Sequence, residues 1–231
     1  MVAKFKLLFL LGLLVPTLVV FKALFVPGTA VWGDAPYFWP EFIKAFPFEP
    51  NAWVGWGNNF GGLNQTLWLA PLMILYKLLN LAFGFNNDIL IRLVFYFPAI
   101  TLALLTPIFF ARSLGLSKTA QFFASFFYVF NTYFLLLIDG GQVGVALAYG
   151  LFPLVLLFLR QLTTKPSFKN FLIALVSLST LFSFDPRVGL IVTFSVVVWN
   201  LIEALTIKNY ALLTNLKWLF LCYLYFRFFL S

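Results

Sequence analysis

Histidine is missing from the 231-residue sequence, and cysteine occurs once, at Cys222. Zinc sites are built mainly from His and Cys side chains, so this composition argues against a zinc enzyme. A lone cysteine has no partner within the chain, which excludes an internal disulfide. A divalent cation held by carboxylate oxygens stays compatible with the sequence, but no residues can be assigned to it.

Charge is also scarce. Only 10% of the residues are charged, 63% are hydrophobic, and the mean hydropathy is +1.00. Soluble domains carry about 25% charged residues, so a water-soluble fold is excluded. The net charge of +8 does not indicate a nucleic-acid partner, because the basic residues are scattered singly among apolar runs and form no basic stripe. The composition predicts an all-α integral membrane protein.

Eight apolar runs follow one another along the chain, at 5–26, 66–85, 89–110, 119–138, 143–159, 168–184, 188–206 and 218–230. The first run follows a basic start, and no A-x-A-like cleavage site comes after it. It is therefore interpreted as an uncleaved first span rather than a signal peptide.

The charges decide which runs cross the membrane. If the run 66–85 does not cross, nine basic residues fall on one side and six acidic residues on the other, as the positive-inside rule requires. The sequence then predicts a cytoplasmic N-terminus, an external loop 27–88 with a juxtamembrane helix at 66–85, and a multi-pass protein of the cell membrane. The seven predicted spans are 5–26, 89–110, 119–138, 143–159, 168–184, 188–206 and 218–231. The alternative is that 66–85 crosses and the other runs are reassigned.

The stretch VWGDAPYFWPE, just past the first run, places Asp34 among Trp32, Tyr37 and Trp39, with Glu41 as the next acid. A carboxylate held against apolar rings has a raised pKa, which suits a general base near neutral pH. Trp and Tyr are also common membrane-interface anchors, so the aromatic residues alone do not establish a site.

Two other acids, Asp139 and Asp185, lie at the predicted outer ends of helical hairpins, in IDGGQVG and FDPRVG. Acids at such depths normally face a cavity or a partner, but Asp-Gly-Gly and Asp-Pro are also turn formers. Arg187 is suited to bind a lipid phosphate. The alternative for Arg187 is an ion pair with Asp185 or ordinary headgroup contact.

The order of several short motifs resembles the GT-C superfamily of integral-membrane glycosyltransferases, which use polyprenyl-phosphate sugar donors. The similarity covers most of residues 1–160. Within the superfamily, the chain is loosely similar to the arabinofuranosyltransferase-D-like group. The motifs that carry the resemblance are Gly33-Asp34, the N-x-x-x-R-like stretch Asn87 to Arg92, the basic turn Ala111 to Ser117, Asn131-Thr132-Tyr133, Asp139, Gly140-Gly141-Gln142 and Ala148-Tyr149.

The resemblance implies transfer of a hexosyl or pentosyl group to a lipid or glycan acceptor. Asp34 would be the catalytic base, and Asp139 would orient the acceptor, with help in holding a divalent cation as the alternative role for Asp139. The residues implied in substrate binding are Glu41, Trp32, Tyr37, Trp39, Arg92 and Arg187. Many members have two adjacent acids where Asp34 stands alone, which puts a metal site in doubt. Members usually have further spans, so we expect 1–231 to be one GT-C-like transmembrane module, truncated at its C-terminus.

Two other classes share the composition. A lipid-linked saccharide flippase or other transporter would place charges near the membrane midplane, but it would show broken helices in matched halves, which the sequence lacks. A non-catalytic membrane fragment would show every compositional feature of the enzyme.

Overall fold

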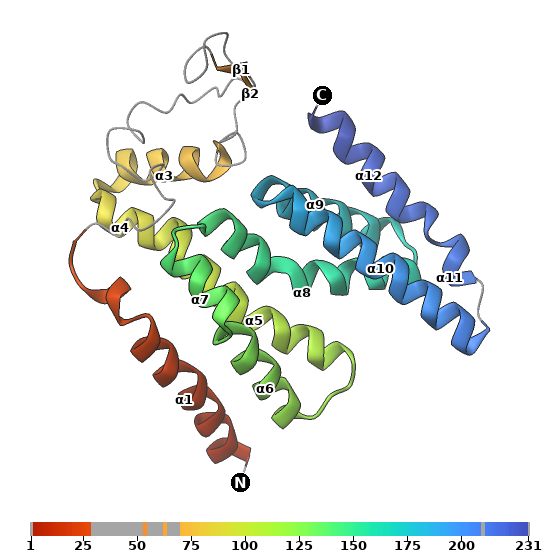
Figure 1. The fold of residues 1–231 in the computed structure, drawn as a ribbon, viewed down its shortest axis with the longest axis horizontal. Helices are drawn as coiled ribbons and strands as arrows, with labels where there is room; N and C mark the ends of the chain where they lie inside the picture. Colours follow the sequence, from red (N-terminus) through yellow and green to blue (C-terminus); the bar gives the residue numbers. More distant parts are fainter. Residues whose placement is uncertain (1, 29–52, 55–61, 64–69, 209–210, 231) are drawn as a thin grey trace. The chain divides into compact units, whose positions relative to one another are not determined.

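A computed structural model describes residues 2–28, 53–54, 62–63, 70–208 and 211–230 (Figure 1). This part of the chain is helical apart from two short strands, β1 (Trp53–Val54) and β2 (Gly62–Leu63). They pair antiparallel, with Trp53 opposite Leu63. The predicted all-α class is therefore confirmed at this level.

Three of the described helical stretches are long and apolar enough to cross a membrane: Asn87–Ser113, Val143–Thr164 and Pro186–Ile207. A fourth is added if the bent pair Lys118–Val129 and Thr132–Asp139 forms one span. These helices support membrane association. The seven-span arrangement and the external loop stay predictions.

Two apolar runs do not form single helices. The first run gives α1 (Val2–Val20) and then a separate 3-10 turn, η1 (Lys22–Phe25). The run 119–138 is broken into α6 (Lys118–Val129) and α7 (Thr132–Asp139). The break follows from capping, because the Asn131 side chain accepts a hydrogen bond from the Phe134 N–H at 2.9 Å and so starts a new helix.

The second predicted span is continuous but irregular. It begins with α4 (Asn87–Ile91), passes through a π-helical turn, η4 (Arg92–Tyr96), and continues as α5 (Phe97–Ser113). Pro98 lies two residues beyond the end of the turn and has no N–H to donate to a carbonyl within it, which favours a local departure from α geometry. Before it, α3 (Ala70–Phe83) lies within the predicted juxtamembrane segment and packs on α4 and η4.

The remaining helices are α8 (Val143–Thr164), α9 (Phe168–Phe184), α10 (Pro186–Ile207), α11 (Ala211–Thr214) and α12 (Lys217–Leu230). The chain divides into two compact units. Unit 1 comprises Met1–Thr101 and Val129–Leu147, and unit 2 comprises Leu102–Tyr128 and Ala148–Ser231. The assignment of residues 1–231 to one transmembrane module remains a prediction.

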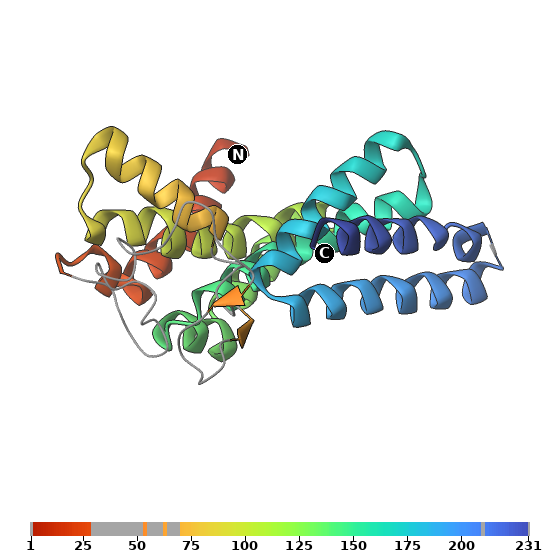
Figure 2. The same cartoon turned by 90° about the horizontal axis from the view of Figure 1, so that it is seen from above.

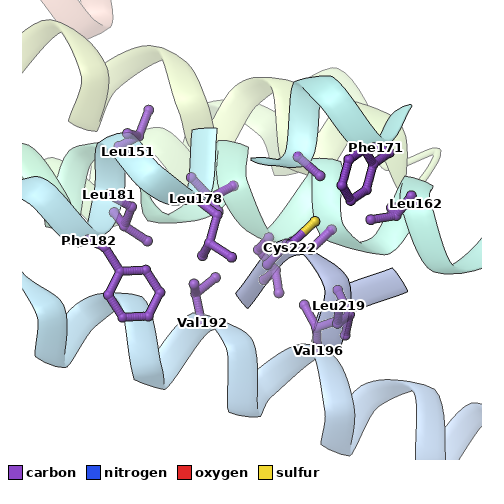
Figure 3. Packing of buried hydrophobic residues seen from close by; sticks show 14 of the residues in the cluster. Leu151, Leu162, Phe171, Leu178, Leu181, Phe182, Val192, Val196, Leu219 and Cys222 are labelled. Atoms are coloured by element: carbon purple, nitrogen blue, oxygen red, sulfur yellow. The ribbon is translucent and has the colours of Figure 1, made fainter. Parts of the chain in front are cut away.

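Unit 2 is built around an apolar cluster from α8, α9, α10 and α12 (Figure 3). Leu181 on α9 and Val192 on α10 are fully buried in it. Close approach is made possible by Gly189, because a Cβ there would lie 2.8 Å from the Phe182 ring. Helix α9 packs on both α10 and α12, and Figure 2 shows it inclined to these two helices.

Hydrogen bonds between helices supplement this packing. The Tyr128 hydroxyl donates to the Tyr149 carbonyl at 2.7 Å, and the Tyr149 hydroxyl donates to the Tyr128 carbonyl at 3.2 Å. Their rings stack with centroids 4.2 Å apart. Thr106 also donates to the Gly150 carbonyl at 2.6 Å. In a bilayer the hydrophobic effect does not drive helices together, because lipid tails are as apolar as the side chains. Hydrogen bonds of this kind therefore help to hold the helices together.

Candidate functional site

A groove of about 350 Å³ lies in unit 1, between the end of the first helix and α7. Its walls are mostly apolar, and the carboxylate of Asp139 is the one charged group among the described residues that line it. One wall comes from the turn η1 and the residue before it, and the other from α7. The residues that define these walls are Phe21, Ala23 and Leu24 on one side and Thr132, Leu135 and Asp139 on the other.

Asp139 is the last residue of α7, and the glycines after it form the turn. The Gln142 N–H donates to the Leu137 carbonyl at 2.9 Å, and the Gly141 N–H donates to the Ile138 carbonyl at 3.3 Å. Gly141 has φ of +70°, so this is a Schellman motif that needs glycine at that position. The chain reversal therefore uses backbone atoms and leaves the side chain of Asp139 available.

The carboxylate of Asp139 is exposed, and it makes no hydrogen bond or ion pair with any residue that the structure describes. The two interpretations of IDGGQVG are thus both accommodated. Glycines explain the turn, and the acid is not needed for it. A carboxylate at the end of an apolar groove can accept hydrogen bonds from a ligand whose other part is apolar.

The opposite wall is held by Arg92. Its guanidinium donates to the carbonyls of Leu24 (Nε, 2.7 Å), Val26 (Nη2, 2.8 Å), Gly28 (Nη2, 2.6 Å) and Asp88 (Nη1, 2.6 Å). Three of these acceptors lie more than 60 residues away in the sequence. Arg92 therefore ties the start of the second predicted span to the end of the first helix.

Arg92 is also the first residue of the π turn. Its backbone N–H bonds to the Ile89 carbonyl, and its carbonyl accepts from the Phe97 N–H. Tyr96, at the end of this turn, is fully buried. π turns are frequent at functional sites, and Arg92 belongs to this one.

Helix α3 is attached to the same region by a tyrosine. The Tyr76 hydroxyl donates to the Asn87 Oδ1 at 2.5 Å. Burial, and secondarily the negative charge of Asp88, raises the pKa of Tyr76 well above its ordinary value, so the hydroxyl keeps its proton. With 14 residues α3 is about 21 Å long, shorter than a bilayer core of about 30 Å.

Arg187 lies in unit 2, where it pairs with Asp185. Its Nη2 is 2.6 Å from the Asp185 Oδ2. Asp185 also caps α10, because its Oδ1 accepts from the backbone N–H groups of Arg187 and Val188. Burial acts to raise the pKa of Asp185, but the hydrogen bonds from Arg187 and Val188 and the charge of Arg187 lower it overall. The structure therefore shows Asp185 at a helix cap and in an ion pair with Arg187, which are the two local alternatives that the sequence offered.

The structure thus brings two predicted site residues, Arg92 and Asp139, into one unit. Five others, Asp34, Glu41, Trp32, Tyr37 and Trp39, lie outside the described residues. No group of three or more His, Cys, Asp or Glu side chains within the described ranges could hold a metal ion.

Sequence reasoning did not single out Tyr96, which is fully buried at the end of the π turn. In the sequence it resembles any other aromatic residue of an apolar run. Sequence reasoning also left Glu203 without a role. In unit 2, Glu203 accepts from the Trp199 indole at 3.1 Å and lies 3.8 Å from the Arg160 guanidinium, which covers the Trp199 ring at 4.9 Å. An acid within an apolar run was the available signal.

Comparison of the chain with protein-family models, with characterised proteins and with solved structures finds no match.

Proposed function

We propose that the chain is a membrane glycosyltransferase that moves a sugar from a polyprenyl-phosphate donor to an acceptor hydroxyl on the external face. The observation that carries the proposal is the apolar groove that ends at the Asp139 carboxylate, which has no hydrogen bond within the described part of the chain. Such a groove suits an amphiphilic substrate. The order of sequence motifs supports the same class.

The sign of the charge assigns roles within the groove. A carboxylate repels the phosphate of a polyprenyl-phosphate donor, whereas it attracts a hydroxyl proton. Asp139 therefore orients the acceptor. Asp34 removes the proton from the acceptor hydroxyl, the hydroxyl oxygen bonds to the anomeric carbon, and the polyprenyl phosphate leaves with the electrons of the broken C–O bond.

Other predicted residues complete the proposal. Trp32, Tyr37 and Trp39 cover the sugar, and Glu41 binds one of its hydroxyls. The proposed topology has seven spans, with the N-terminus in the cytoplasm and segment 27–88 outside. The length of α3, too short for a perpendicular crossing, supports a segment that lies at the outer interface.

Transfer from a radiolabelled polyprenyl-phosphate sugar, assayed in vesicles with a panel of hexosyl and pentosyl donors, tests the proposal. We expect D34N to abolish transfer and D139N to reduce it severely. The matched control is E203Q, which removes an acid of unit 2 but keeps an acceptor for the Trp199 indole. Equal transfer by D34N and the unsubstituted protein would refute the proposed mechanism. Movement of intact donor across the bilayer without transfer would instead identify a flippase.

A further inference from the structure

We infer that Arg92 is a positioning residue that fixes one wall of the groove through main-chain carbonyls, and that it does not bind the donor phosphate. The inference rests on the proposed function for its consequence in catalysis, but its structural part stands on hydrogen-bond geometry alone. Arg92 would act on the substrate only through the segment Leu24 to Gly28.

The first argument comes from the number of N–H donors that the Arg92 guanidinium has. Arginine has five N–H donors, and four hydrogen bonds engage the Nε proton, one Nη1 proton and both Nη2 protons. One N–H is left. A bidentate phosphate contact needs two parallel donors, so the side chain cannot make it while these four bonds are intact.

The acceptors carry the second step. Leu24 belongs to η1, and Val26 and Gly28 follow it where regular structure ends, so their carbonyls have no partner within a helix. An unpaired carbonyl is most costly at Leu24, which is buried, because water cannot replace the lost hydrogen bond there. Gly28 has φ of +125°, a conformation that L side chains rarely adopt, and this backbone presents its carbonyl to Arg92.

The groove carries the third step. Leu24 is 2% exposed and lines the groove, and its carbonyl is the acceptor of the Arg92 Nε–H. Ring contacts hold the same turn from its sides, with Phe21 edge-on to Phe134 at 6.3 Å and Phe25 stacked on Phe97 at 5.5 Å. Without Arg92 the rings would still attract η1, but the carbonyls of Leu24, Val26 and Gly28 would lose their hydrogen bonds to the guanidinium.

The point where Arg92 acts also has a consequence along the chain. Gly28 is the last described residue before segment 29–52, and Asp34 follows it by six positions in the sequence. Arg92 therefore binds the residue that comes just before the segment with the proposed base. A change at Arg92 is expected to alter the alignment of substrate with that base, and so to lower kcat more than it raises KM.

Hydrogen–deuterium exchange of the full chain, resolved by peptide, tests the structural part without any substrate. In R92Q we expect the backbone amides of residues 22–28 to exchange faster by about tenfold or more, because several charge-assisted bonds are lost. The control R112Q makes the same charge change at an exposed arginine at the end of α5, and it should leave these amides unchanged. Unchanged exchange in R92Q would overturn the inference.

R92K keeps the charge but offers a single ammonium, which cannot span four carbonyls. We expect it to exchange nearly as fast as R92Q, and it also serves if R92Q does not fold. Wild-type exchange in R92K would overturn the inference. Exchange as in the unsubstituted protein combined with weaker binding of polyprenyl phosphate in R92Q would show a phosphate ligand instead. Faster exchange in a chain that transfers no sugar would keep the positioning role and refute only the proposed function.

Discussion

Different interactions stabilise the interior of unit 1 and the interior of unit 2. In unit 2 the helices α8, α9, α10 and α12 share one apolar cluster, and Gly189 lets two of them approach closely. In unit 1 only Leu24 of the four η1 residues is buried, and one arginine secures the turn through carbonyl oxygens. Packing resists any change of shape, whereas hydrogen bonds to main chain set the position of a segment that has few buried side chains.

This difference indicates where function is to be sought. Leu181 and Val192 are fully buried in the cluster of unit 2, so substitutions there should change stability. The groove of unit 1 has an exposed carboxylate whose removal should leave stability intact. Substitutions in the two units should therefore separate into those that unfold the protein and those that inactivate it.

The largest effect is expected from L181A in unit 2. Leu181 is fully buried in the apolar cluster, and its truncation leaves a cavity. Such changes cost about 2–5 kcal/mol of unfolding free energy. Unfolding by SDS titration in mixed micelles would measure it. The control is L190A, because Leu190 on α10 is 57% exposed and should cost little. Equal losses for both variants would show that the cluster does not dominate unit 2.

A smaller loss is expected from G189A. The added methyl group would lie 2.8 Å from the Phe182 ring, so the ring or the helix must shift, at about 1–3 kcal/mol. The double variant G189A/F182L tests the cause, because a smaller side chain makes room for the methyl group. If the two changes simply add in the same unfolding measurement, the close approach of α9 and α10 is not what Gly189 provides.

Much of the fold could be predicted from the sequence, because apolar runs of bilayer length leave few alternatives to helices. The helix α3 and the cap at Asp185 follow from local residue types. Breaks within runs were missed, because hydropathy does not report capping: Asn131 is a single polar residue, yet it divides α6 from α7. The hydrogen bonds from Arg92 to Leu24, Val26 and Gly28 could not be predicted, because these acceptors lie more than 60 residues away in the sequence, where no local pattern indicates them.

A modest effect with a pH signature is expected at Asp185. The folded-state pKa is lowered, so the ion pair stabilises the protein above the unfolded pKa of about 4 and is lost as pH falls below it. D185N keeps the cap and removes the charge. Because the Arg187 side chain is 78% exposed, we expect a loss of only about 0.5–1 kcal/mol at pH 7 that shrinks towards zero below about pH 4.

D185A also removes the cap and should cost about 1 kcal/mol more than D185N at both pH values. Thermal unfolding in detergent at pH 7 and pH 3.5 separates the two contributions. A D185N deficit that is the same at both pH values would contradict the assigned ion pair.

The smallest effect on stability is expected from D139N, and it tests the contrast between the units most directly. The carboxylate is exposed, and the Schellman turn after it uses backbone atoms of Gly141 and Gln142, so the unfolding free energy should change by less than about 0.5 kcal/mol. Sugar transfer should nevertheless fall by about 10²-fold, because an uncharged amide orients an acceptor hydroxyl less strongly than a carboxylate. G141A is the opposite control, since it strains the turn and should lower stability. If D139N lost stability as G141A does, Asp139 would belong to the turn, and the groove would lose the one charged group that suggests a substrate.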